Sequence, residues 1–306
     1  MMPLLLLSAL SLLPTAGGSG ASQTPAWIAH RGVHQVIQLQ GVEADTCTAD
    51  RILPSTHTHL ENTLESVQAA LEAGAQKVEV DLQRSADGHL VLFHDADLSC
   101  RTDGSGPVAE HTLSALQALD LGYGYTADGG QSFPLRGAPQ RMPTLEALLE
   151  TFPEAAFVFH LKSSDPRVGL DLARALEGAE NPHWVYGHPR SVAAFTEQAP
   201  HIPTLDKPRL KACLKEAART PLQATLPSTC DRSWILLPAP WTRLIPGGPR
   251  RFFKRAERSG VPVVLAGPLV DGNGTGVDSS RDLRRVPRSF QGWLWTNRVE
   301  EMAPPR

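Results

Sequence analysis

The chain has 306 residues, of which 41% are hydrophobic and 20% are charged, and its formal net charge is −3 at pH 7. This composition is typical of a globular protein with a sizeable core, and the length fits one large α/β domain or two smaller ones. Because the chain has no excess of positive charge, we expect no nucleic-acid partner.

The first segment has the pattern of a secretory signal. Residues 4–13 are apolar except for Ser8 and Ser11, and Ser19 and Ala21 are the small residues expected before a cleavage site. The apolar stretch is too short to span a membrane, although no Lys or Arg precedes it. We therefore expect a signal peptide at residues 1–21, a periplasmic or secreted location, and no stable membrane insertion.

Export would place the chain in an oxidising compartment, where we expect the four cysteines to form two disulfides. No two of them have C-x-x-C spacing, which argues against a zinc site. Three pairings are possible. We favour Cys213–Cys230, which closes a local Pro-rich loop, and Cys47–Cys100, which ties an early loop to the segment after His94.

Strands and helices alternate along the rest of the chain. A short apolar strand at 27–32 is followed by a long segment, 33–60, that has no clear period and that we interpret as a loop. Apolar residues at helical spacing predict a helix over 61–74, and alternation predicts a strand at 77–82. A turn at Asp87 and Gly88 then returns the chain along 89–95. This connection is too short for a parallel crossover, so we expect an antiparallel excursion.

The later pattern predicts a closed barrel. Helices are expected at 113–120 and 143–152, around a Gly- and Tyr-rich loop. Strands are expected at 156–162, 183–189, 202–206, 233–238, 262–268 and 292–297, with helices near 166–178, 190–199, 208–218, 248–259 and 279–285. Eight strands separated by helices predict a TIM (β/α)8 barrel. A doubly wound sheet is the alternative, but no Gly-rich dinucleotide loop follows the first strand.

Polar residues gather where barrel strands end, which is where such barrels place their active sites. Two carboxylates at i and i+2 share one face of a strand and form an oxygen platform suited to a divalent cation. Two cationic side chains suit a phosphate, and two histidines can exchange protons near neutral pH. Together they indicate phosphodiester cleavage. The residues are His30, Arg31, Glu79, Asp81, His94, His160 and Lys162.

The motifs and their order resemble the glycerophosphodiester phosphodiesterase family. They are HRG (30–32), ENT (61–63), E-x-D (79–81), the DG turn (87–88), VLFHD (91–95), TDGSG (102–106), PTLEALL (143–149), the LK pair at 161–162 and a closing WTNR (295–298). The resemblance is detailed from 27 to 162 and thinner afterwards. It implies a TIM barrel over 22–306 with a subdomain inserted after the second strand, at about 83–142.

The resemblance also implies a hydrolase of lipid and glycerol metabolism. It would cleave a small-molecule phosphodiester into an alcohol and glycerol phosphate, with one divalent metal ion, Mg²⁺ or Ca²⁺. By position, His30 would be the general base and His94 the general acid. Arg31 would bind the phosphate, and Lys162 would bind the phosphate or tune the metal. Glu79 and Asp81 would be metal ligands.

Glu61 would start a helix that faces the same mouth. There it would either support the residues that touch the metal or stabilise the first helical turn.

Two departures from the family pattern affect these expectations. His160 stands where the family has an acidic residue, and an imidazole favours Mn²⁺ or Zn²⁺ over Mg²⁺ or Ca²⁺. Either the metal preference shifts, or water fills the position and His160 lies behind it. The segment 33–60 is longer than usual and carries Cys47, His57 and His59, so it would restrict the alcohol group that the mouth admits.

Two other functions remain open. A phospholipase D-like enzyme acting on lysophospholipids would need an apolar rim at the mouth. A barrel that binds phosphodiesters without cleaving them would not need two histidines. The preferred head group and the oligomeric state do not follow from the sequence.

Overall fold

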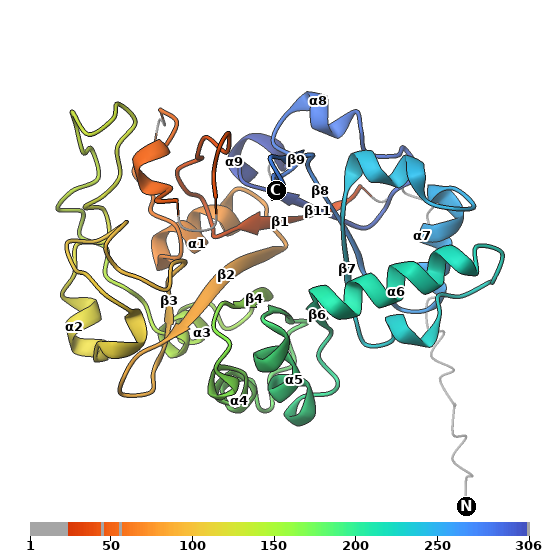
Figure 1. Ribbon diagram of the computed structural model, residues 1–306, viewed down its shortest axis with the longest axis horizontal. Helices are drawn as coiled ribbons and strands as arrows, with labels where there is room; N and C mark the ends of the chain where they lie inside the picture. The colour runs from red at the N-terminus through yellow and green to blue at the C-terminus, as the bar shows by residue number, and fades with distance from the viewer. Residues whose placement is uncertain (1–23, 44–45, 55–56, 305–306) are drawn as a thin grey trace, which may run out of the picture.

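The computed structural model describes residues 24–43, 46–54 and 57–304 (Figure 1). The expected signal peptide lies outside these residues. Eight parallel strands form one sheet in the order β6-β5-β4-β2-β1-β11-β8-β7. They are β1 (Ala26–His30), β2 (Lys77–Arg84), β4 (Phe157–Leu161), β5 (Trp184–Gly187), β6 (Thr204–Asp206), β7 (Ile235–Pro238), β8 (Val263–Ala266) and β11 (Trp293–Thr296). A parallel bridge between Thr204 and Ser233 brings the two edges together, so the sheet is a nearly closed TIM barrel, as predicted.

Helices follow the strands, as the sequence pattern predicts. They are α1 (Leu64–Glu72), α3 (Leu145–Thr151), α4 (Pro166–Ala175), α5 (Pro189–Gln198), α6 (Lys207–Arg219), α7 (Pro249–Arg258), α8 (Ser280–Leu283) and α9 (Val299–Met302). α4 and α6 begin at a capping aspartate, Asp165 and Asp206, followed by a proline in the first turn. The aspartate satisfies a free backbone N–H, and proline needs no partner there, so these residues fix where each helix begins.

The excursion after β2 is antiparallel, as predicted. β3 (Leu90–Leu92) pairs with β2, with Leu82 opposite Leu92. The segment from β3 to α3 contains α2 (Leu113–Gln117) and packs around an apolar cluster that it shares with the 33–60 segment and that is separate from the barrel core. That cluster includes Val91, Phe93, Leu98, Leu116, Leu121 and Met142. Figure 1 shows this part of the chain to one side of the barrel.

Both disulfides that we favoured are present. Cys47–Cys100 joins the 33–60 segment to the excursion, and Cys213–Cys230 joins α6 to the short helix η3 (Ser228–Cys230). No described helix has both the length and the apolar character needed to cross a membrane.

Strand alternation sorts the residues of β2 into two faces. Val78, Val80 and Leu82 belong to the core between the sheet and the helices. Lys77, Glu79 and Asp81 alternate with them and therefore face the barrel interior. The interior core lies below the site and consists of Ile28, Val158, Trp184, Leu205, Trp234, Val264, Ala266 and Trp295.

Lys77 occupies the floor of the barrel. Its ammonium group lies 4.7 Å from the ring centre of Trp184 and 5.2 Å from that of Trp293, and it donates a hydrogen bond to the carbonyl of Pro182. These contacts compensate part of the cost of burying a cation. The remaining burial cost lowers the pKa of Lys77 to about 8.

The lowered pKa of Lys77 should make the free energy of unfolding depend on pH. Between the folded pKa of about 8 and the ordinary value of 10.5, the unfolded chain binds a proton that the folded chain lacks. Stability from this group therefore rises with pH across that window. We expect the unfolding free energy of wild type, relative to Lys77→Met, to rise by about 2 kcal/mol from pH about 7 to about 10. Urea unfolding of both proteins measures this, and a constant difference would contradict it.

Candidate functional site

The register of three strands brings the predicted residues together. β1 places His30 beside Glu79 of β2, and β4 places His160 beside Asp81. Paired residues of parallel strands point to the same side of the sheet, so all four side chains enter the same end of the barrel. Lys162 follows directly after β4 and reaches the same end.

The two carboxylates are fully buried and are held by hydrogen-bond donors. Glu79 accepts bonds from the Tyr186 hydroxyl, at 2.8 Å, and from the Arg31 backbone N–H, at 3.1 Å. Asp81 accepts a bond from the Asn62 side-chain amide at 3.0 Å, and the Arg31 Nε lies 3.2 Å from it. The side-chain carbonyl of Asn62 in turn accepts the Asp81 backbone N–H at 2.9 Å.

The two carboxylates differ in their ease of ionisation. Burial, together with the neighbouring Asp81 charge, raises the pKa of Glu79 to about 8. Burial also opposes ionisation of Asp81, but the charges of His94 and Arg31 outweigh it and hold the pKa of Asp81 well below its usual value. Asp81 therefore ionises more easily than Glu79, and Glu79 is the carboxylate that has too little positive charge around it.

Glu79, Asp81 and His160 form a group that could hold a metal ion, because one ligand atom from each lies within 4.8 Å of the others. The His160 ring stacks on Tyr186, with ring centres 4.0 Å apart, and its Nδ1 lies 2.8 Å from Asp81. Burial lowers the pKa of His160 to about 4, so the ring is neutral and has a lone pair to offer. A divalent cation fits this donor set, because it would supply the charge that Glu79 lacks.

A chain of hydrogen bonds fixes the proton on His30. Asp278 accepts from the Asn297 side-chain amide at 2.7 Å, so Asn297 turns its carbonyl oxygen toward His30 Nδ1, 2.6 Å away. The ring must therefore carry its proton on Nδ1. Burial, and then the charge of Arg31, hold the pKa of His30 well below its usual value. Its unprotonated Nε2 accepts a hydrogen bond from the Arg31 Nε at 3.2 Å and lies 3.8 Å from Glu79.

His94 lies between an acidic and a basic side chain. Its Nδ1 lies 2.5 Å from the Asp95 carboxylate, and its Nε2 lies 3.0 Å from the Lys162 ammonium. Burial, and then the charge of Arg31, lower the pKa of His94, while the contact with Asp95 opposes this. Lys162 also lies 3.8 Å from Asp81, so it stands between His94 and the carboxylate pair.

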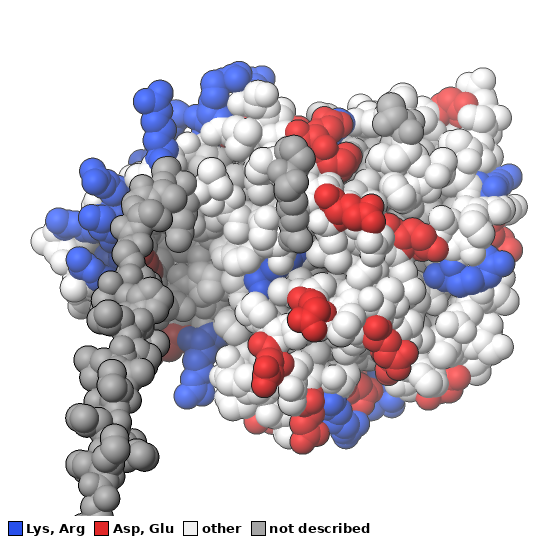
Figure 2. Space-filling view, turned by 180° about the vertical axis from the view of Figure 1, so that it is seen from behind, with Lys and Arg blue, Asp and Glu red and all other residues white. Residues whose placement is uncertain are grey.

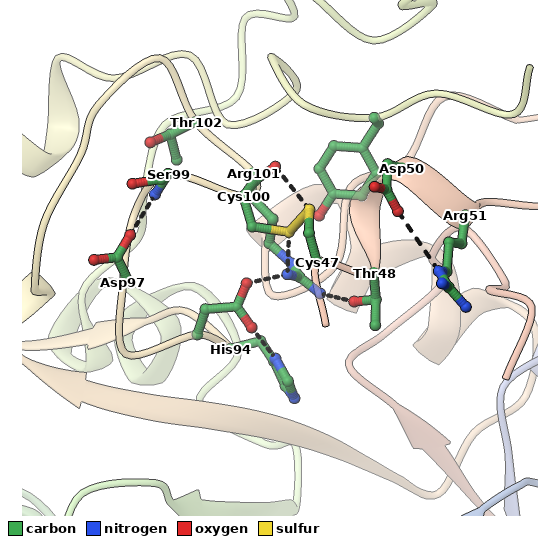
Figure 3. The surroundings of a disulfide bond; sticks show 12 residues. Cys47, Thr48, Asp50, Arg51, His94, Asp97, Ser99, Cys100, Arg101 and Thr102 are labelled. Carbon is green, nitrogen blue, oxygen red and sulfur yellow. Dashed lines mark hydrogen bonds and ion pairs between the residues drawn. A yellow bond between two sulfur atoms is a disulfide. The ribbon is translucent and has the colours of Figure 1, made fainter. Parts of the chain in front are cut away.

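An ion-pair chain links this site to the excursion and to the Cys47–Cys100 disulfide. Figure 3 shows the end of this chain, with Arg101, Thr48 and His94 near the disulfide. Arg31 lies 2.6 Å from Glu61, Glu61 pairs with Arg101, and Arg101 pairs with Asp95. Arg101 also donates to the Thr48 hydroxyl at 2.8 Å, and the Tyr125 hydroxyl donates to Glu61 at 3.0 Å. Each cysteine is the chain neighbour of one of these residues, so the disulfide holds Thr48 near Arg101.

The structure brings together all seven predicted strand-end residues, and it places Glu61 between two arginines rather than in the metal group. Sequence reasoning assigned no role to their partners. Asn62 and Asn297 lie inside the ENT and WTNR motifs, which could have suggested them. Arg101, Tyr125, Tyr186 and Asp278 carry no comparable signal.

A model of the glycerophosphoryl diester phosphodiesterase family matches residues 52–166. Over this stretch the chain is similar to that family. The matched residues include Glu79, Asp81, His94 and His160. His30 and Asn297 lie outside the matched range.

Curated proteins also match part of the chain. An uncharacterized Mycobacterium tuberculosis protein is 36% identical over 137 residues, which are 44% of this chain and 45% of that protein. A Bacillus subtilis glycerophosphodiester phosphodiesterase is 33% identical over 132 residues, which are 40% of this chain and 44% of that protein. The matches therefore span less than half the length of these two relatives.

Solved structures of the family show the same fold. The glycerophosphoryl diester phosphodiesterase domain of the uncharacterized M. tuberculosis protein superposes with a TM-score of 0.64 at 20% identity, covering 90% of this chain and 98% of that one. An Oleispira antarctica phosphodiesterase in complex with sn-glycerol-3-phosphate gives 0.58 at 18% identity, covering 91% and 95%.

Metal binding should stabilise the folded chain, because the unfolded chain does not keep the three ligand side chains together. We expect Mn²⁺ or Zn²⁺ at about 100 times its dissociation constant to stabilise wild type by about 3 kcal/mol. Glu79→Gln should lose most of this gain, whereas the exposed Glu72→Gln should keep it. Thermal unfolding with and without each metal measures the effect. An unchanged wild-type Tm with every metal would contradict the assignment.

Proposed function

We propose that the protein hydrolyses glycerophosphodiesters to an alcohol and a glycerol phosphate in a metal-dependent reaction. The observation that carries this proposal is the pair of histidines on either side of the buried carboxylates. His30 carries its proton on Nδ1 and has an unprotonated Nε2, which contacts the phosphate-binding Arg31, whereas His94 is backed by Asp95 and contacts a lysine. A site that only bound phosphodiesters would not need one histidine placed to accept a proton and a second placed to donate one.

The relatives support the same reaction. The B. subtilis relative is named for glycerophosphodiester cleavage, and the O. antarctica structure holds sn-glycerol-3-phosphate, described as its product. The substrate is thus a small molecule. Hydrolysis would leave the phosphate on glycerol and release the other alcohol.

We assign the roles from the geometry. Arg31 and Lys162 bind the phosphate through charged N–H donors. A divalent metal held by Glu79, Asp81 and His160 would supply further positive charge against the phosphate oxygens. His30 removes the proton from the attacking hydroxyl, which belongs either to water or to the substrate itself.

His94 protonates the departing alcohol oxygen. In the absence of substrate its Nε2 faces the Lys162 ammonium at 3.0 Å, so that nitrogen accepts rather than donates. A phosphate would attract the ammonium and add negative charge beside the ring. Both effects favour a proton on Nε2, and the Asp95 carboxylate stabilises the imidazolium that results.

The alcohol side of the substrate would enter a cavity of about 730 Å³ that includes His30 and His94. Residues of the stretches 34–43 and 46–53, and of the hairpin of β9 (Leu269–Val270) and β10 (Asn273–Gly274), form a wall of this cavity. Hydrogen bonds from Gly41 to Asp271 and from Asn273 to Val42, both 3.0 Å long, hold the two together. We infer that this wall selects the alcohol group.

The apolar part of the same wall favours lysophospholipids as a second candidate substrate. Val36, Leu39, Val42, Leu53 and Val270 line it. An acyl chain would bury apolar surface there, whereas a free glycerophosphodiester would not. We also propose that the chain is exported, which the two disulfides support, and that the excursion at about 83–142 is an inserted subdomain.

Exchanging the histidine ligand should change the metal preference. We expect wild type to release glycerol phosphate from glycerophosphocholine fastest with Mn²⁺ or Zn²⁺, and His160→Glu to shift toward Mg²⁺ or Ca²⁺, because a carboxylate is a harder ligand. Exposed His201→Glu is the control and should keep the wild-type order. An unchanged order in His160→Glu would mean that His160 is not a ligand.

If neither protein cleaves glycerophosphocholine with any metal, this substrate is wrong. Lysophosphatidylcholine would then be tested, followed by phosphodiester binding alone.

Substrates that differ in their leaving group should distinguish the role of His94 from that of His30. His94→Ala should slow cleavage of an alkyl phosphodiester by about 100- to 10,000-fold, because the alcohol leaves poorly without a proton. The same variant should cleave a glycerophospho-nitrophenol ester almost normally, since nitrophenolate leaves unprotonated. His30→Ala should slow both. Steady-state kinetics on the two substrates measure this, and equal losses for both esters in His94→Ala would contradict the general-acid role.

A further inference from the structure

Apolar side chains are exposed on the outer side of α6 and α7. Leu222, Trp241 and Leu244 have exposed fractions of 80%, 51% and 79%. Leu222 follows α6, and the other two belong to the short helix η4 (Ala239–Leu244) between β7 and α7. Such large exposed fractions are unusual for these residue types and indicate a surface that meets another apolar phase.

Trp241 and Leu244 line an apolar groove, whereas Leu222 lines a second cleft. The groove has a volume of about 180 Å³, and Leu214, Leu237, Trp241, Leu244, Ile245 and Phe252 line it. A basic cleft of about 490 Å³ lies beside it, on the next residues of α7. Arg250, Arg251, Lys254 and Arg258 line this cleft together with Leu222, and its lining contains no Asp or Glu.

The basic side chains of the cleft are available for a partner. All four are exposed, and none forms an ion pair with a carboxylate of the described residues. The one acidic residue of α7, Glu257, lines a neighbouring cleft that Arg250 and Lys254 also line, and it does not line the basic cleft. Figure 2 shows Lys and Arg gathered on the left of the view, the side on which α6 and α7 lie, while Asp and Glu occupy the centre.

Arg255 fixes the apolar and basic parts relative to one another. It is buried and donates to the carbonyls of Thr225, at 3.0 Å, and Ala217, at 3.1 Å. These bonds hold the segment after α6, which carries Leu222, against α7. Apolar and cationic side chains therefore share one surface, which we name the α6–α7 patch. It consists of Leu222, Trp241, Leu244, Arg250, Arg251, Lys254 and Arg258.

We propose that the α6–α7 patch docks the protein peripherally on an anionic phospholipid surface. Tryptophan and leucine enter the interfacial region of a bilayer, and adjacent lysine and arginine side chains attract anionic head groups. A folded protein partner would fit the groove alone, but it would have to supply matching acids beside it. A lipid surface matches both parts at once. The patch begins at the carboxyl end of β7, the end of the barrel that holds the site.

Vesicle flotation tests the proposal on the purified protein. Wild type should bind vesicles of phosphatidylcholine mixed with phosphatidylglycerol, should bind pure phosphatidylcholine weakly, and should be released by salt. Each basic residue is expected to contribute about fivefold, so the triple variant Arg250→Gln, Arg251→Gln, Lys254→Gln should bind about a hundredfold more weakly. The double variant Trp241→Ala, Leu244→Ala should lose about tenfold or more.

A control variant that loses the same number of positive charges elsewhere distinguishes binding through the α6–α7 patch from general electrostatic attraction to the vesicle. Arg281, Arg284 and Arg288 are three exposed arginines at or near α8. The triple variant Arg281→Gln, Arg284→Gln, Arg288→Gln should bind nearly as wild type does. An equal loss in both triple variants would show diffuse charge attraction and overturn the assignment.

Two further outcomes would overturn the proposal. One is wild-type binding by the double variant, and the other is self-association through Trp241 and Leu244 without vesicle binding. Cleavage of a soluble glycerophosphodiester by the patch variants should remain unchanged, so a failed docking test is distinguishable from a failed function.

Discussion

The site depends on two buried carboxylates that share one face of β2. Glu79 and Asp81 repel each other and are removed from water, so the fold has to supply donors and positive charge around them. Arg31 does most of this, through its backbone N–H to Glu79 and its guanidinium to Asp81. The guanidinium is itself buried and is balanced by Glu61, which is also paired with Arg101. Charge compensation thus extends from the barrel strand into the excursion.

The backbone around Arg31 is shaped for this task. Arg31 and Asn62 have φ values of 56° and 59°, which non-glycine residues seldom adopt. Gly32, with φ 79°, follows, and a Cβ there would lie 2.5 Å from the Ser66 hydroxyl. The turn after β1 is therefore pressed against the first turn of α1. The contact costs backbone strain, which the ion pairs and hydrogen bonds of Arg31 and Asn62 offset.

Much of this arrangement follows from local sequence. Alternation in β2 predicts the shared face, and the short turn at Asp87 predicts the antiparallel return. The partners of these residues could not be predicted in the same way. Asp278 reaches His30 through Asn297, which is 267 positions further along the chain, and only the closure of the barrel brings β11 beside β1. The α6–α7 patch was missed for a related reason, because Trp241 and Leu244 look like core residues until the surrounding helices are placed.

The Cys47–Cys100 bond also has a consequence for the entrance of the site. Arg101 holds Asp95 behind His94, and the disulfide is the covalent link between Arg101 and the wall of the mouth. In a reduced chain the barrel core would still pack, since that core does not include this bond, and the wall would keep its hydrogen bonds to the β9–β10 hairpin but lose its covalent link to the excursion. The redox state of the surroundings would therefore change how firmly the entrance of the site is held, and not whether the barrel packs.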